Sequence, residues 1–430
     1  MKSKLYALGA LLVMLMGLLA ACGGSSSTTT AGGKTVITLW THSAGNASEM
    51  STLNKEVTSF NGSHSQYQIQ IQSFPQASYN DSVSAAALSH KLPCILDMDN
   101  PTVANFAWSR YVQALPVTDS DVQQMGLLQS AIGRYQGKIY ALGQFDVALT
   151  MFARKSILQK YNIRIPTLDQ PWTANEFNDM LSKLKSSGAF QFPFDLNPQY
   201  GGEWLPYAYS PMLQSFGGDL IDRKSLTSAD GTLNGPAAAK WGQWFQGLFK
   251  NGYANPKPSS DQGFLQGKVA LWYTGSWATD DVVKKYGKDA LFLPSVNFGT
   301  GPKIGGGSWE WGISATCPQQ ASQGASQFIK FLMQPANIAL LNNATGLIPT
   351  TPAATSLVPR YATGSPYRIL FDMLQRFTVM RPPTPAYPTI SSSFQKAAQG
   401  IIQGSDVQTN LDNAVNAIDQ DIQQHNNYQQ

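Results

Sequence analysis

Carboxylate and aromatic side chains stand together at several points of this sequence. Asp97 and Asp99 share one short segment, Glu203 precedes a tryptophan, and Glu310 lies between two tryptophans. Glycosidases place a pair of carboxylates across the scissile bond, so these four acids could serve a carbohydrate-active enzyme. The same groups could also bind a sugar without cleaving it, because aromatic rings cover its C–H faces and carboxylates accept hydrogen bonds from its hydroxyl groups.

The densest aromatic stretch follows Gly267. Trp272, Tyr273 and Trp277 lie in a run that also contains glycine and serine and is too polar to be core. Aromatic faces beside flexible backbone donors favour a floor for a polar ligand with apolar faces. Packing at the end of a strand is the alternative for each of these tryptophans.

The candidate ligand-binding residues combine aromatic rings with acids and amides, a composition that suits a sugar. They are Trp40, His42, Asp99, Asn100, Gln144, Glu203, Trp204, Tyr207, Trp272, Tyr273, Trp277, Trp309, Glu310, Trp311 and Arg381. The set is short of Arg and Lys, which argues against a phosphate or carboxylate ligand, although Arg381 could change that reading. The sequence has no nucleophile elbow, metal motif or catalytic Cys/His arrangement, so we expect a protein that is not an enzyme and holds no metal or cofactor.

Strands alternate with helices near the beginning of the chain. Apolar or alternating patterns predict strands over 36–40, 67–71 and 94–99, and helical spacing marks residues 50–60. This order argues for an α/β fold with a largely parallel sheet. Ligands bind beyond the carboxyl ends of such strands, which places residues 40–42 and 97–100 in the site. A loop histidine at position 42 and turn chemistry before Pro101 remain the alternatives.

The middle of the chain contains one segment without a helical period. Trp241 and Trp244 lie on a core stripe and are predicted to be structural. Residues 200–207 have no such stripe and place a carboxylate between two glycines and a tryptophan. We therefore expect this segment to face a pocket, and packing at a helix N-terminus is the alternative. The residues concerned are Glu203, Trp204 and Tyr207.

The first residues form a targeting segment. Lys2 and Lys4 precede an apolar run that is too short for a stable membrane span, and Cys22 follows small residues as in a bacterial lipobox. We expect residues 1–21 to be a lipoprotein signal peptide, Cys22 to be acylated, and residues 22–34 to form a flexible tether. The protein would be exported and lipid-anchored to the outer face of the cytoplasmic membrane, whether a periplasm or the open cell exterior lies beyond. An ordinary signal peptide with a chance cysteine is the alternative.

The charge of the mature chain is nearly balanced. Cleavage removes two of 30 basic residues against 26 acidic ones, so the net charge becomes 30 − 2 − 26 = +2. This value gives no electrostatic case for a nucleic-acid partner.

Several segments resemble the extracellular solute-binding proteins of ABC importers, of the sugar-binding, maltose-binding-protein-like type. Residues 264–277 resemble the family signature F-x-x-G-K-A-A-M…G-x-W, and residues 171–177 resemble P-x-T-W-d-E-F. Residues 345–349 and 381–387 are similar to x-G-x-i-P and R-P-x-x-p-x-Y. The match is partial at Gly143, where the family often has proline. The resemblance spans nearly the whole chain through the order and spacing of its motifs.

The resemblance implies a two-lobed, periplasmic-binding-protein-like fold of type II, with a ligand cleft and a hinge between the lobes. Lobe I would hold residues 35–145 and 276–320, and lobe II residues 146–275 and 321–430. In this family the returning strand lies antiparallel beside the third strand, which implies a disulfide between Cys94 and Cys317; two buried free thiols are the alternative.

The implied function is capture of a mono- or oligosaccharide in a closing cleft and its delivery to the transmembrane subunits of an ABC permease. The protein would act as a monomer anchored to the membrane through its lipid. The competing functions are an exported carbohydrate-active enzyme that uses a carboxylate pair, and a surface lectin with no role in transport.

Overall fold

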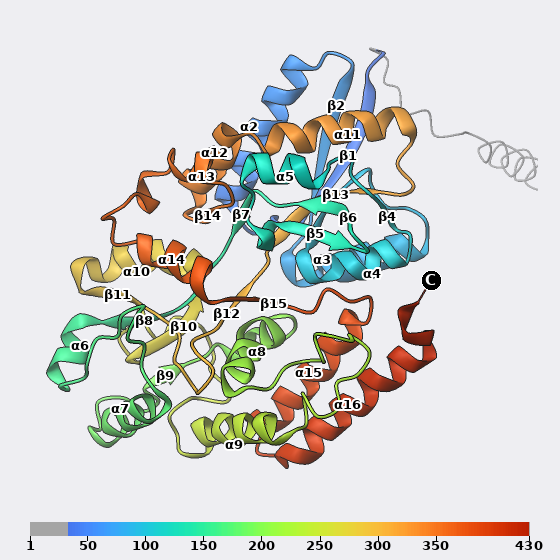
Figure 1. Cartoon of the computed structure of the whole chain (residues 1–430). Coiled ribbons are helices and arrows are strands. Elements are labelled where there is room, and N and C mark those ends of the chain that lie inside the picture. The colour runs from blue at the N-terminus through green and yellow to red at the C-terminus, as the bar shows by residue number, and fades with distance from the viewer. Residues whose placement is uncertain (1–32, 430) are drawn as a thin grey trace, which may run out of the picture.

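The first of two lobes is built on a seven-stranded sheet. The computed structural model describes residues 33–429, and this sheet lies in its upper part in Figure 1. Its strand order is β2 (Tyr67–Ser73), β1 (Thr35–Thr41), β3 (Ile95–Asp99), β13 (Trp309–Ser314), β6 (Lys138–Leu142) and β5 (Ile132–Tyr135), with β4 (Val112–Gln113) paired to β13. β1 runs parallel to β2 and β3, as the alternation of strands and helices predicts, and the half-exposed β2 lies at the sheet edge.

Helices cover both faces of this first sheet. One core joins α2 (Ala47–Ser63) and α11 (Gln319–Leu332) to buried residues of β1 and β3, such as Leu39 and Ile95. The other core joins α3 (Gln76–Leu88) and α4 (Val103–Trp108) to Leu96 and Met98. Successive strand residues point to opposite faces, so two adjacent residues of β3 enter different cores. The remaining elements of this lobe are η1 (Asn100–Thr102), α5 (Asp119–Met125), η2 (Gln129–Ala131), α12 (Pro335–Thr345) and α13 (Pro352–Thr355), which packs against α12.

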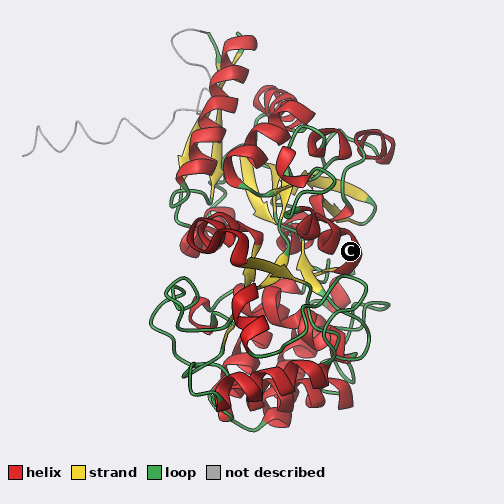
Figure 2. Ribbon diagram, turned by 90° about the vertical axis from the view of Figure 1, so that its left-hand side faces the viewer, coloured by secondary structure: helices red, strands yellow, loops and turns green. Residues whose placement is uncertain are grey.

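The second lobe contains a four-stranded sheet and most of the remaining helices (Figure 2). Its strand order is β11 (Ala290–Leu293), β8 (Leu149–Arg154), β10 (Leu271–Gly275) and β9 (Phe194–Asp195). The helices are α6 (Lys155–Lys160), α7 (Ala174–Ser186), η3 (Pro198–Tyr200), α8 (Trp204–Phe216), α9 (Pro236–Lys250), η4 (Ser276–Ala278), α10 (Thr279–Tyr286), η5 (Gly287–Asp289), η6 (Pro359–Tyr361), α14 (Arg368–Phe377), α15 (Tyr387–Ile402), α16 (Val407–Gln424) and η7 (Asn426–Tyr428). Thr173 and Glu176 close a capping box at the start of α7.

The chain passes between the lobes at three places. It descends from β6 through β7 (Phe145–Asp146) to β8, and returns from β11 through β12 (Ile304–Gly306) to β13. It descends again from α12 through β14 (Ile348–Pro349), which pairs with β7, and β12 pairs with β15 (Thr378–Met380). The paired short strands lie where the chain passes between the lobes, an arrangement that can serve as a hinge.

The lobe boundaries differ from those expected at two segments. β11 pairs with β8 and α10 packs against β11, so residues 276–293 lie in the second lobe. α11 and α12 pack against β1 and α2, so residues 319–345 lie in the first. The helical period reveals the buried face of a helix but not the sheet that covers it.

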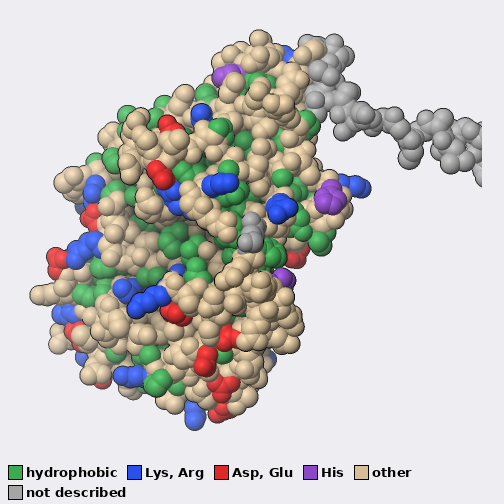
Figure 3. Space-filling view, turned by 45° about the vertical axis from the view of Figure 1, so that its right-hand side comes forward, with side chains coloured by type: hydrophobic (Ala, Val, Ile, Leu, Met, Phe, Trp, Pro, Cys, Tyr) green, Lys and Arg blue, Asp and Glu red, His purple; other side chains and the backbone are tan. Residues whose placement is uncertain are grey.

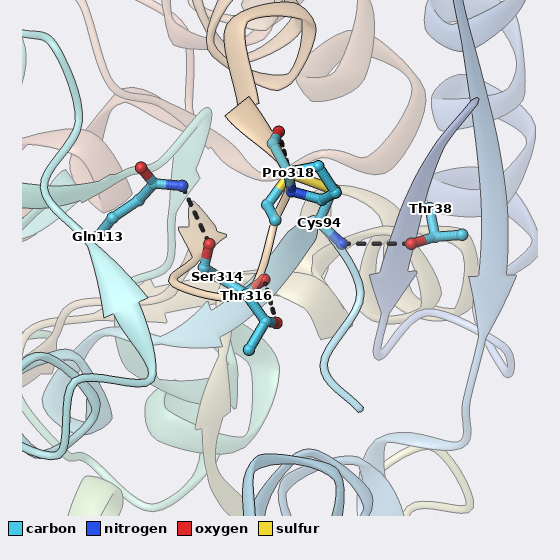
Figure 4. The surroundings of a disulfide bond; sticks show 7 residues. Thr38, Cys94, Gln113, Ser314, Thr316 and Pro318 are labelled. Carbon is cyan, nitrogen blue, oxygen red and sulfur yellow. Dashed lines mark hydrogen bonds between the residues drawn. A yellow bond between two sulfur atoms is a disulfide. The ribbon is translucent and has the colours of Figure 1, made fainter. Parts of the chain in front are cut away.

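The structure contains a disulfide between Cys94 and Cys317, the pair implied by the family layout (Figure 4). β13 runs antiparallel to β3, so the end of one strand meets the start of the other. The Ser314 amide donates to the Cys94 carbonyl oxygen at 3.0 Å, and the Cys94 amide donates to Thr38 Oγ1 at 3.2 Å.

The described residues bear on a membrane-spanning helix but not on the expected lipid anchor. Within residues 33–429, no helix combines the length and the apolar character needed to cross a bilayer. The expected signal peptide and the acylation site at Cys22 lie outside the described residues.

Candidate functional site

The two lobes meet where the strands of the first sheet end. Asp99 is the last residue of β3, and Trp309, the first residue of β13, pairs with it. From the second lobe, the segment after β15 brings Arg381 to this place, and the start of α8 brings Glu203. Residues far apart in the sequence therefore meet at one junction. It lies at the carboxyl end of β3, where ligands bind in α/β folds.

Arg381 is the centre of this junction. Its Nη1 and Nη2 atoms donate to Asp99 Oδ2 and Oδ1 at 2.9 and 2.8 Å, a fork that binds both carboxylate oxygens. Nη1 also donates to Glu203 Oε1 at 2.6 Å, and Nη2 to the Gly307 carbonyl oxygen at 2.9 Å. The guanidinium lies 5.0 Å from the centre of the Tyr207 ring, and the side chain is only 4% exposed.

Further groups fix Glu203 within the second lobe. The Tyr387 hydroxyl donates to its Oε1 and the Ser391 hydroxyl to its Oε2, both from α15. Burial raises the pKa of Glu203, against the lowering effect of the Arg381 charge. For Arg381, burial lowers the pKa, but Asp99, Tyr387 and Glu203 together outweigh it and raise the pKa well above its ordinary value. We name Asp99, Arg381, Glu203, Tyr387 and Ser391 the Arg381 network.

His42 lies in a second polar group, inside the first lobe. Its Nδ1 hydrogen-bonds to Asp97 Oδ2 at 2.5 Å, its Nε2 is 3.5 Å from Glu49 Oε2, and its ring stacks on Trp309 at 3.9 Å. Burial lowers the pKa of His42, but Asp97 and Glu49 raise it by more, so the net shift is upward. A cavity of about 20 Å³ beside these residues has room for about one water molecule.

The second lobe presents a wall of aromatic rings, formed by Tyr200, Trp204 and Trp277. Tyr200 and Trp277 are 42% and 41% exposed, and each packs edge-on against the buried Trp204, with ring centres 5.4 and 6.2 Å apart. Trp204 also lies 6.3 Å from Tyr207, which connects this aromatic wall to the Arg381 network. Partly exposed rings of this kind can cover the apolar face of a ligand.

Several candidate residues lie inside the lobes instead. Trp272 and Tyr273 are buried on the central strand β10, where Trp272 Nε1 donates to Asn197 and the Tyr273 hydroxyl donates to the Ala208 carbonyl oxygen. Their positions in the core agree with the alternative of strand packing. Half-buried Trp40, at the end of β1, packs against Phe74 with ring centres 4.7 Å apart.

Four more candidates are bound to each other or to core groups of the first lobe. Trp311 Nε1 donates to Gln144 Oε1 at 3.1 Å, and Gln144 Nε2 donates to Glu56 Oε1 at 2.8 Å. Asn100 Nδ2 donates to Glu310 Oε1 at 2.7 Å, and burial raises the pKa of Glu310 well above its ordinary value. These contacts hold the ends of β3 and β13 in place, and Glu310 Oε2 is buried without a hydrogen-bond partner among the described residues.

Sequence reasoning missed other residues that shape the junction. Tyr387 and Ser391 lie on α15, whose helical pattern hides their contacts with Glu203. Gly275 is also structural here, because a Cβ at this position would come within 1.9 Å of the Trp277 ring. Its place two residues before Trp277 is the signal that could have indicated it. Within residues 33–429, no group of three or more His, Cys, Asp or Glu side chains could hold a metal ion.

A family model for bacterial extracellular solute-binding proteins matches residues 55–363, more than half of the chain. The protein belongs to this family. The two lobes, the three crossings and the junction between strand ends are thus the family fold carried by this sequence.

Solved structures of similar proteins share the fold over most of the chain. The GacH receptor of Streptomyces glaucescens, solved without ligand and with acarbose, is 21% identical with a TM-score of 0.73, covering 90% of this chain and 97% of that one. The cyclic α-maltosyl-1,6-maltose binding protein of Arthrobacter globiformis is 19% identical with a TM-score of 0.73, at 90% and 99% coverage. The maltose/maltodextrin-binding domain MalE of Bdellovibrio bacteriovorus, bound to maltotriose, is 19% identical with a TM-score of 0.73, at 90% and 100% coverage.

Proposed function

We propose that this protein captures a sugar between its lobes and delivers it to the permease of an ABC importer. The observation that carries the proposal is the exposed part of the aromatic wall beside polar groups of both lobes. Rings for the C–H faces and carboxylates or amides for the hydroxyl groups form the combination that a sugar requires. Membership of the solute-binding family and the sugars bound by the similar structures support the same ligand class.

The residues we place in this binding surface are Trp277, Tyr200 and Trp204 of the second lobe with Trp40 and Trp309 of the first. Trp309 is held flat by His42 on one side, and Trp277 is held by Trp204 at its edge. Rings fixed in this way lose little conformational entropy when a ligand covers them.

The acids that a hydrolase would need are already bound to other groups. Asp99 and Glu203 share the Arg381 guanidinium, and Asp97 is bound to His42. Because these three carboxylates have positional partners, and Glu310 Oε1 accepts a hydrogen bond from Asn100, we propose binding without hydrolysis. The ligand would leave the protein unchanged, which chromatography of the recovered sugar checks directly.

A thermal-shift panel tests the proposal. The mature chain is screened against maltotriose, mannobiose and tagatose, with an amino acid, a polyamine and phosphate as controls. A ligand that binds only the folded state at a hundredfold excess over its Kd stabilises it by about 2.7 kcal/mol. A shift with a sugar class and none with the controls is expected, and a shift confined to phosphate or a polyamine would contradict the proposed ligand class.

We further propose that the mature protein is a lipid-anchored monomer on the outer face of the cytoplasmic membrane. The lipobox before Cys22 and the polar residues 23–34 support this arrangement. Basic and acidic side chains are interspersed on the face shown in Figure 3. Replacement of Cys22 by serine should move the protein from the membrane fraction to the soluble exported fraction, and retention in the membrane would contradict the anchor.

A further inference from the structure

The Asp99–Arg381 ion pair spans the two lobes. Asp99 ends β3 in the first lobe, and both of its carboxylate oxygens accept hydrogen bonds from the Arg381 fork at 2.8 and 2.9 Å. Their side chains are 9% and 4% exposed, so the pair is closed off from solvent. A charged pair at this depth requires its partners to stay together, because either charge left alone in the interior is costly.

Arg381 is fixed to the second lobe by its neighbours. The preceding residue, Met380, accepts a hydrogen bond from Arg223 Nη1 at 2.8 Å through its carbonyl oxygen. Arg381 itself donates to Glu203 at 2.6 Å, and Glu203 is held in turn by Tyr387 and Ser391. Movement of the second lobe would therefore carry Arg381 together with Glu203.

Two other contacts join the lobes along α4. Asn105 Nδ2 donates to the Pro385 carbonyl oxygen at 2.7 Å. The Trp108 ring packs edge-on against Tyr428 near the C-terminus, with ring centres 4.8 Å apart. Figure 1 places α4 directly above α15 and the C-terminal end of the chain. The ion pair is thus one of a row of contacts that hold the lobes together in this form.

We propose that Asp99 and Arg381 form an inter-lobe latch that stabilises the closed form, and that Glu203 keeps Arg381 on the second lobe when the latch opens. In the closed form, the guanidinium binds both carboxylates. In the open form, Asp99 enters water at the end of β3 and Arg381 retains Glu203. The arginine therefore has a carboxylate partner in both states, and only the Asp99 contact distinguishes them.

Small-angle X-ray scattering of the ligand-free protein tests the latch. The wild-type protein should have the radius of gyration calculated from the structure described here. Asp99→Asn should enlarge it, because loss of charged hydrogen bonds shifts the equilibrium roughly ten- to a hundredfold toward the open form. Glu203→Gln should leave the radius unchanged, since this carboxylate lies on the same lobe as Arg381. Asp119→Asn, which removes an exposed pair with Arg134 inside the first lobe, is the matched control.

Circular dichroism establishes that each variant is folded. The double variant Asp99→Asn with Arg381→Gln removes both charges of the inter-lobe pair, while the Tyr387 and Ser391 hydroxyls still donate to Glu203. The double variant should be as expanded as Asp99→Asn. A compact Asp99→Asn protein, an equal expansion in Glu203→Gln, or a wild-type protein that is already expanded would each overturn the latch. None of these measurements uses a sugar, so their outcome is independent of the proposed ligand.

Discussion

Trp277 gives the sharpest test of the aromatic wall. The variant Trp277→Ala removes a ring that is 41% exposed and leaves the backbone at the end of β10 intact. If a sugar covers the exposed face, the variant should bind it more weakly. The fold should survive, because the residue is 41% exposed, lies beyond the end of β10 and packs edge-on against Trp204.

The expected loss follows from the exposed area. A tryptophan buries up to about 250 Å² when fully covered, so an exposed fraction of 41% leaves about 100 Å² for a ligand. At about 25 cal/mol per Å², complete coverage is worth about 2.5 kcal/mol and half coverage about 1.3 kcal/mol. The Kd of the Trp277→Ala protein should therefore rise by roughly ten- to seventyfold.

Isothermal titration calorimetry with the sugar identified in the thermal-shift panel measures this change. Trp244→Ala is the matched control, since Trp244 is a half-buried tryptophan of the same lobe that packs between Phe216 and Phe298. Its loss should lower the melting temperature and leave the Kd within about twofold, well under the 1.4 kcal/mol of a tenfold change. A Trp277→Ala protein that also binds within twofold of the wild type would refute the stacking role of this ring.

Three further predictions follow from particular contacts. Gly275→Ala should displace the ring of Trp277 and lower sugar affinity, with a smaller loss of stability than a core substitution causes; calorimetry with a melting curve distinguishes the two effects. Replacing Cys94 and Cys317 by serine opens a link across 223 residues and should lower the free energy of unfolding by up to about 5 kcal/mol in denaturant titrations. Burial raises the pKa of Glu56 to about 8, so its contribution to stability is complete below about pH 4.3 and is lost as the pH rises toward 8. Glu56→Gln should flatten that decline in urea titrations, and an unchanged slope would contradict a protonated Glu56.

Patterns with a single physical cause could be predicted from the sequence. The strands β1, β2 and β3 follow from apolar runs and local alternation along the chain. The pairing of β13 beside β3 depended instead on the family layout, because 209 residues lie between Asp99 and Trp309 (309 − 99 − 1) and no local pattern indicates the contact.

The aromatic residues of β10 show where such patterns fail. Trp272 and Tyr273 stand beside glycine and serine in the sequence, yet β10 is an interior strand of its sheet. Both residues are buried although they point to opposite faces, so both faces of β10 are covered. Trp277 follows only a few residues later, beyond the strand end, and is half-exposed. Composition alone does not locate the point where a strand leaves its sheet, and this point decides which ring can reach a ligand.

The position of Arg381 in the structure determines whether its charge is available to a ligand. In the sequence it was the residue that could have favoured an anionic ligand. In the structure its two terminal nitrogens already bind Asp99, Glu203 and the Gly307 carbonyl oxygen. A ligand phosphate or carboxylate at this place would have to displace two carboxylates from Arg381 and would remain close to their negative charges. Its binding would cost more free energy than the binding of an uncharged hydroxyl group. The charge of Arg381 is therefore used between the lobes, and the aromatic wall is the surface left for a ligand.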